Sequence, residues 1–236
     1  MNKIYSRKHI KLPISNKLTK YSKIRKSKIS KSKISKSKNV ISECKLVSLA
    51  NASQKHLDEL SYITRDTSIM KYIGKGNIWT MKDLKQYMLD EKNENRKNIL
   101  QRQYYSFILV KDNTVIGFIA GRKNTQLIPL SQYSPFDLLL RMFISSKYSG
   151  HGYGKIIIKL FIEKYKQILS SNKTFITSHN NNSKQSSRPI VKLVSDIDEN
   201  NIASIKIHLA NGFQFTKTIK YPNKHIYNRY LLELHI

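Results

Sequence analysis

The sequence predicts a mixed α/β domain preceded by a basic tail. Three observations lead to this fold class: short runs of β-branched and aromatic residues, longer segments with apolar residues at helical spacing between them, and a sharp change of composition near residue 40. The sequence therefore divides into residues 1–40, which we expect to be disordered, and residues 41–236, which we expect to fold as one domain.

Strands and helices are predicted to alternate along the domain. A first strand at 45–49 precedes a helix that begins after Ser53, a good N-cap residue, and ends near Thr64. A second helix runs from Met81 to about Asn95. Further helices are predicted to begin near Lys155 and at Asn201, further strands to lie at 105–110, 115–120, 138–144, 190–194, 213–220 and 227–234, and loops to lie at 124–135 and 172–188. Residues 111–114 predict a hairpin, and the last two strands predict a closing antiparallel pair.

The N-terminal tail is strongly basic. Residues 1–38 contain 14 Lys and Arg and no acid, which is half of the formal net charge of +28. Ile24, Ile29 and Ile34 recur every five residues, a period that gives neither a helix nor a strand an apolar face. The tail therefore predicts disorder, with contact to nucleic acid or a ribosome as its functional interpretation and a solvated extension as the alternative.

The sequence contains few features that indicate a membrane segment, a leader peptide or a disulfide. The sequence has no apolar run near the roughly 20 residues that a membrane-spanning helix needs, and no secretory leader is recognisable. Cys44 is the only cysteine, which excludes an internal disulfide and fits a reducing compartment; we interpret it as a buried thiol. We expect a cytoplasmic protein, with the nucleus as an alternative location, and we expect no membrane partner and no metal site.

The most informative segment is 143–155, where an apolar strand runs through a glycine-rich turn into a helix. Gly150, Gly152 and Gly154 leave room for backbone N–H groups to approach a ligand. The following helix directs the positive end of its dipole to the same place. The segment therefore predicts a site for a phosphate-bearing ligand.

The spacing excludes two common phosphate-binding motifs. A P-loop needs Gly five positions before Gly154 and Ser or Thr after Lys155, but the sequence has Ser149 and Ile156 there. A dinucleotide fingerprint needs Gly-x-Gly-x-x-Gly, whereas the spacing here is Gly-x-Gly-x-Gly. The turn instead resembles the acyl-CoA-binding turn of the GNAT superfamily of N-acetyltransferases, in which Arg/Gln-x-x-Gly-x-Gly/Ala follows a strand.

Two further segments resemble the same superfamily. Asn201 and Ser204, followed by a helix that ends in Gly-Phe at 212–213, resemble the other wall of the CoA cleft. Residues 66–80, with the amphipathic segment after them, resemble the ribosomal-protein-alanine acetyltransferase branch. This resemblance covers nearly the whole predicted domain. It implies a central mixed, mostly antiparallel sheet flanked by helices, and acetyl-CoA as co-substrate.

The resemblance also implies roles for individual residues. The cofactor-binding residues would be Phe143, Ile144, Ser149, Gly150, His151, Gly152, Tyr153, Gly154, Lys155 and Asn201. The backbone N–H of Phe143 or Ile144 would stabilise the oxyanion. Ser204, or His208 four residues later on the same helical face, would protonate the departing thiolate. Many members of the superfamily carry Tyr near the position of His208, and this sequence does not.

Some features depart from the family pattern or stay open. Ser149 stands where the family usually has Arg or Gln, so a cation is missing beside the phosphates. Asp137 is the only acid beside the key strand, and a water relay is an equal alternative for the general base. Trp79 is interpreted as packing in or beside the core, with a wall of the acceptor site as the alternative.

We therefore expect an acyltransferase that moves an acetyl group from acetyl-CoA to a primary amine, such as a protein N-terminus, by direct attack. The alternatives are a small-molecule amine as acceptor, or a catalytically weak GNAT-like module that binds nucleic acid through its tail. A surface this basic repels a Lys-rich acceptor unless that acceptor sits in an acidic assembly such as a ribosome.

Overall fold

The computed structural model describes residues 43–73, 76–123, 134–172, 190–220 and 226–236. They belong to one compact unit, Val40–Ile236. The predicted disorder of residues 1–40 and most of the two predicted long loops lie outside the described residues, so these expectations stay predictions.

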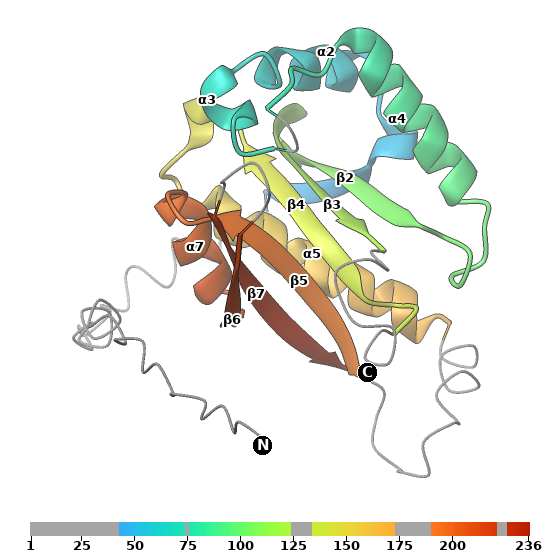
Figure 1. Ribbon diagram of the computed structural model, residues 1–236. Coiled ribbons are helices and arrows are strands. Elements are labelled where there is room, and N and C mark those ends of the chain that lie inside the picture. The colour runs from blue at the N-terminus through green and yellow to red at the C-terminus, as the bar shows by residue number, and fades with distance from the viewer. Residues whose placement is uncertain (1–42, 74–75, 124–133, 173–189, 221–225) are drawn as a thin grey trace, which may run out of the picture. The chain divides into compact units, whose positions relative to one another are not determined.

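Seven strands form one sheet in the order β1-β2-β3-β4-β5-β7-β6 (Figure 1). Their bounds are Cys44–Ser48 (β1), Tyr104–Lys111 (β2), Thr114–Arg122 (β3), Leu138–Ile144 (β4), Ile190–Asp198 (β5), Gln214–Lys220 (β6) and Ile226–His235 (β7). Every neighbouring pair is antiparallel except β4 with β5, which is parallel. The structure thus confirms the predicted mixed, mostly antiparallel sheet.

Local sequence explains most strand ends, but not the end of β5. Asp112 and Asn113 have φ of 47° and 59° and close the predicted β2-β3 hairpin. The sequence pattern ended the fifth strand at Val194, whereas β5 continues to Asp198 because residues 195–198 pair with β7. Tertiary pairing here outweighs the low strand preference of aspartate.

Five α-helices and two short 3-10 turns occupy the described chain. They are α2 (Gln54–Ile63), α3 (Thr67–Met70), α4 (Met81–Glu94), α5 (Tyr153–Ser170) and α7 (Ile202–Leu209), with η2 (Leu49–Asn51) and η4 (Ser146–Tyr148). Ser53 and Thr80 are N-caps whose side chains accept the N–H of the third helical residue, so the predicted cap at Ser53 is confirmed. The four-residue α3 was not predicted.

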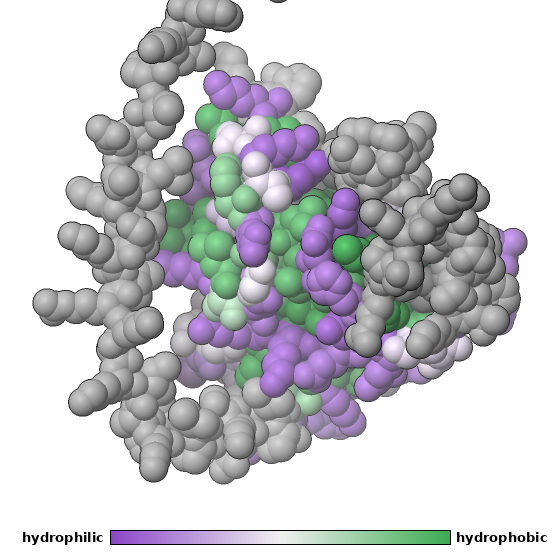
Figure 2. All heavy atoms as spheres, turned by 90° about the horizontal axis from the view of Figure 1, so that it is seen from below, coloured by the Kyte–Doolittle hydropathy of each residue, from purple (hydrophilic) through white to green (hydrophobic). Residues whose placement is uncertain are grey.

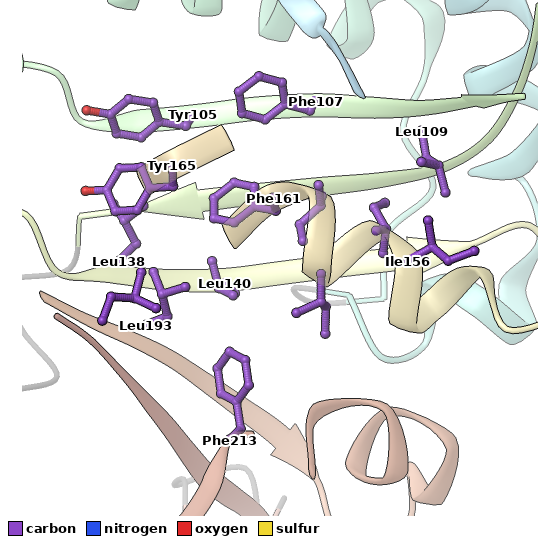
Figure 3. Close-up of a cluster of buried hydrophobic side chains, with 14 of the residues drawn as sticks. Tyr105, Phe107, Leu109, Leu138, Leu140, Ile156, Phe161, Tyr165, Leu193 and Phe213 are labelled. Atoms are coloured by element: carbon purple, nitrogen blue, oxygen red, sulfur yellow. The ribbon is translucent and has the colours of Figure 1, made fainter. Parts of the chain in front are cut away.

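The main core lies between α5 and one face of the sheet. Figure 3 shows Phe161 and Tyr165 of α5 packed against β2 and β4, with Phe213 approaching from the start of β6. The Tyr165 ring lies 5.2 Å from the ring of Tyr105, and the Phe161 ring lies 6.0 Å from that of Phe107. Because these side chains are fully or nearly fully buried, α5 is held firmly behind the central strands.

A second core lies on the opposite face, under α2 and α4. Leu57 and Leu60 of α2 and Leu84 of α4 pack with Ile108 of β2 and Phe118 of β3. The main strand contacts of these helices are with β2 and β3, and in Figure 1 they lie over that part of the sheet. The contacts of these helices with the sheet are therefore centred on β2 and β3.

Some hydrophobic side chains reach the surface. Figure 2, which views the molecule from below, shows hydrophobic residues between hydrophilic ones. Ile202 and Leu209 of α7 and Phe215 of β6 are 45%, 50% and 49% exposed. Scattered exposed residues of this kind are ordinary in monomeric proteins and need no partner to explain them. None of the described helices combines the length and apolarity needed to cross a membrane.

Candidate active site

The sheet opens at its centre, between β4 and β5. The two strands pair only through Leu138 with Leu193 and Leu139 with Val194. From residue 140 onwards the edge of β4 that faces β5 has no strand partner among the residues that the structure describes. Sequence patterns cannot predict this divergence, because it depends on how two remote strands are held by their other neighbours.

The open edge of β4 presents the N–H groups of alternate residues. The N–H of Ser145 donates to the carbonyl of Ile116 on β3 at 2.9 Å. Since successive N–H groups of a strand point to opposite edges, that of Phe143 also faces β3, whereas those of Met142 and Ile144 face the open edge. Of the two predicted oxyanion donors, this geometry favours Ile144 over Phe143.

The glycine turn presents a row of free N–H groups. Five consecutive backbone N–H groups have no acceptor within the described chain: Gly150, His151, Gly152, Tyr153 and Gly154. Gly150 and Gly152 have φ of 79° and 87°, and a Cβ atom at either position meets nothing within 4 Å, so the space before them is open. Free N–H groups at the start of an 18-residue helix form an anion site. These residues therefore fit the diphosphate of CoA.

Side chains around this row are exposed and partly basic. Lys147 and Lys155 are exposed on either side of it. Ser149 is also exposed, and its carbonyl accepts a hydrogen bond from Nδ1 of His151 at 2.8 Å. Tyr153 differs, since its ring is buried and its hydroxyl lies 3.2 Å from the Nζ of Lys111. Tyr153 can therefore face a ligand only through its backbone.

Gly154 has a packing role. A Cβ atom on Gly154 would lie 2.4 Å from Cδ1 and 3.2 Å from Cγ1 of Ile207 on α7. Glycine at this position leaves room for the Ile207 side chain against the first turn of α5, and a larger residue would require that side chain to move. This contact places the first turn of α5 against the C-terminal half of α7, which also carries His208.

Asn201, Ser204 and His208 form one hydrogen-bonded group on α7. The Asn201 side chain caps the helix by accepting the N–H of Ser204 at 3.2 Å. The Nδ1 of His208 lies 2.8 Å from the Ser204 carbonyl oxygen and 3.4 Å from Oγ of the same residue. A carbonyl oxygen can only accept, so Nδ1 carries the hydrogen, and in the neutral ring the other nitrogen carries none.

Burial keeps His208 neutral. Its side chain is 3% exposed, and its ring lies 5.0 Å from the ring of Phe213 in an edge-to-face arrangement. Desolvation lowers the pKa of His208 below its ordinary value of 6.5, although its hydrogen bond to the Ser204 backbone opposes the shift. At neutral pH the only proton of this imidazole is therefore engaged by the backbone.

Two carboxylates near the divergence are already engaged. Asp137 accepts the N–H groups of Lys192 at 2.7 Å and Ser134 at 3.1 Å, and burial raises its pKa. Asp196 on β5 receives two hydrogen bonds from Arg229 on β7, at 2.7 and 2.9 Å. Asp137 therefore ties β4 to β5 where they still pair, and neither group is placed as a free base.

Two residues singled out in the sequence have packing roles. The ring of Trp79 lies 5.3 Å from that of Phe118 and 5.7 Å from that of Phe143, which confirms its packing beside the core. Its role as a wall of the acceptor site stays a prediction. Cys44 is 8% exposed, and burial raises the pKa of its thiol, as expected for a structural cysteine.

Residues 47–214 match the family described as acetyltransferase (GNAT) domain. The chain therefore belongs to the GNAT family of acetyltransferases, as the motif resemblance predicted. Family membership confirms the predicted enzyme class, an acetyltransferase with acetyl-CoA as co-substrate. Comparison with curated proteins gives no match.

Solved structures of similar fold include three acetyltransferases. RimL, a ribosomal L7/L12 alpha-N-protein acetyltransferase in complex with coenzyme A, has 12% identity and a TM-score of 0.57 over 80% of this chain and 93% of that one. The putative acetyltransferase YncA from Salmonella typhimurium, with acetyl-CoA, has 12% identity and a TM-score of 0.54 over 81% and 94%. The aminoglycoside acetyltransferase AAC(6')-Ib with coenzyme A has 14% identity and a TM-score of 0.53 over 80% and 92%. At these identities the comparisons establish a shared fold.

Proposed function

We propose that this protein transfers the acetyl group of acetyl-CoA to a primary amine, and that the amine is a protein N-terminus. One observation carries the proposal: the edge of β4 opens where this strand leaves β5, and after the short η4 turn the chain continues into the five N–H groups at 150–154 that have no acceptor among the described residues. The N–H row would hold the diphosphate, and acetyl-CoA would supply the thioester that carries the acetyl group.

The residues of the chain can support direct attack by the amine. The N–H of Ile144 is aimed at the open edge and can donate to the carbonyl oxygen as it gains negative charge. The hydroxyl of Ser204 can donate a proton to the departing sulfur, and the proton that the amine loses as the amide forms can return to Ser204 through water. His208 holds the Ser204 carbonyl with its only proton, which makes it a positioning residue. This assignment gives different roles to Ser204 and His208, which the sequence left as alternative proton donors.

The acceptor class rests on charge and on resemblance. A polyamine or aminoglycoside needs an acidic pocket, but Asp137 and Asp196 are both occupied by other groups of the protein. Residues 66–80 resemble the ribosomal-protein branch, and RimL is among the structures of similar fold. The fold of AAC(6')-Ib keeps a small-molecule amine as the second candidate. Contact of the basic tail with nucleic acid remains a prediction from its charge.

Binding of acetyl-CoA tests the site. A ligand that binds only the folded state stabilises it by about 2.7 kcal/mol at 100 times its Kd, so acetyl-CoA should raise Tm. Gly152→Val should abolish this shift, because a side chain at φ 87° displaces the N–H row. Gly212→Val is the matched control: φ there is 88°, so the backbone strain is similar, but Gly212 lies outside the row.

The outcomes separate the assignments. A folded Gly152→Val variant that keeps the full shift would place the cofactor elsewhere. Mass spectrometry of acetylation then identifies the acceptor, with a peptide that has a free α-amino group, the same peptide blocked at its N-terminus, and an aminoglycoside. Acetylation of the aminoglycoside alone would replace the proposed acceptor with the second candidate.

A further inference from the structure

An exposed arginine lies in the middle of the central strand. Arg141 is flanked along β4 by apolar residues and is nevertheless exposed. Its side chain lies on the same face as Phe143, two residues further on, whose ring packs with that of Trp79. Within the described ranges, no ion pair or hydrogen bond involves its guanidinium. A charge within an apolar run is a signal that the sequence interpretation passed over.

The surroundings explain this exposure. On one side the β3 partner of Arg141 is Ala120, whose small side chain leaves space. On the other side β5 has already diverged. The helices α2 and α4 make their main strand contacts with β2 and β3, and Arg141 lies one strand beyond these contacts.

A second arginine lies on the same face. Arg122 at the end of β3 pairs with Leu139, so it is a diagonal neighbour of Arg141, at a backbone distance of about 7–8 Å. Arg122 is also exposed and makes no ion pair with the described part of the chain. We call the surface defined by these two residues the arginine face.

The neighbouring acid does not neutralise this surface. Extending the register of Leu139 with Val194 places Asp196 of β5 level with Arg141. Both oxygens of the Asp196 carboxylate are held by Arg229. The arginine face therefore has two guanidinium groups available for a carboxylate from another molecule.

The position of the face relates it to the reacting amine. Arg141 lies three residues before Ile144, which corresponds to about 10 Å along a strand. An extended peptide rises about 3.3 Å per residue. If its α-amino group is at the level of Ile144, its third and fourth residues lie about 7 and 10 Å further on, near the level of Arg141.

We propose that the arginine face docks an acidic N-terminal segment of a protein acceptor, with Asp or Glu at position 3 or 4. This inference rests on the proposed function and names its acceptor class. Charge complementarity carries it, because Arg binds carboxylates in bidentate geometry and the chain has a net charge of +28.

Competing peptides and charge variants of the full chain test the proposal. One ten-residue peptide has a free α-amino group and Asp at positions 3 and 4, and its twin has Asn there. The Asp peptide should show a kcat/KM about tenfold higher, mainly through KM, and Arg141→Glu should remove this preference. Arg96→Glu, at an exposed arginine just beyond α4, makes the same change in net charge and should keep it. Arg141→Gln provides a second variant that adds no new charge.

Fluorescence anisotropy of both labelled peptides measures binding without turnover. Equal kcat/KM for the two peptides would contradict docking at the arginine face. An equal loss of the preference in Arg141→Glu and Arg96→Glu would do the same, and either result would leave the acetyltransferase assignment intact. Binding of the Asp peptide to the wild type but not to the Arg141 variants, without acetylation, would support the face and contradict the proposed function. Absence of both binding and acetylation would contradict both.

Discussion

The contact between Gly154 and Ile207 allows one prediction to be worked out in free energy. An alanine in place of Gly154 should gain about 0.5–1 kcal/mol, because it reduces the backbone freedom of the unfolded chain. Its Cβ would lie 2.4 Å from Cδ1 of Ile207, and relieving such overpacking typically costs 1–3 kcal/mol. We expect Gly154→Ala to lower the free energy of unfolding by about 1 kcal/mol.

The effect should reverse when Ile207 is shortened. Ile207→Ala removes the atoms that the new methyl group would meet, so Gly154→Ala in this background should stabilise by up to about 1 kcal/mol. The coupling between the two substitutions is then about 2 kcal/mol, well above the 0.3–0.5 kcal/mol expected of independent sites. Urea unfolding of the four proteins at constant pH measures it. An identical effect of Gly154→Ala in both backgrounds would refute the assigned contact.

Two further predictions concern protons. Ser204→Ala should lower kcat by about 10- to 100-fold with little change in acetyl-CoA affinity. The pH profile of the wild type should show no group of pKa 6–7, because buried His208 stays neutral. Full turnover of Ser204→Ala would show that Ser204 is not the proton donor. Lys123 is buried, donates to the carbonyls of Ile99 and Leu100 at 2.8 Å, and has its pKa lowered to about 8 by desolvation. The unfolded chain therefore binds more protons between pH 8 and 10.5, so wild-type stability should rise with pH relative to Lys123→Met, by up to about 1.4 kcal/mol per unit. Urea unfolding at pH 7.5 and 9.5 checks this, and a constant difference between the proteins would contradict it.

Much of the fold could be predicted because its elements are encoded locally. The cap at Ser53, the turn at 112–113 and the apolar spacing in α5 each depend on residues that are close in sequence. The end of β5 was predicted too early, since Asp196 and Asp198 are held in the strand by β7, about 30 residues away. Pairing between remote strands is invisible to local pattern.

The candidate site was predictable in composition and less so in geometry. The glycines at 150 and 152 and the residues on α7 could be recognised by their order and spacing. The N–H group of β4 that faces the open edge can be identified only once the hydrogen bond from Ser145 to β3 is known, because N–H groups of successive residues point to opposite edges. The different roles of Ser204 and His208 depend on which carbonyl the imidazole contacts and on its burial against Phe213.

The sequence by itself determined the family, the glycine-rich turn between strand and helix, and the basic character of the chain, because each is a matter of which residues occur in which order. Only the tertiary structure decided where β4 leaves β5, that Ile207 packs against Gly154, and that Arg141 is exposed in the middle of the sheet. These features arise from contacts between segments that are distant along the chain. Their geometry exists only after the sheet and both helical layers have packed together.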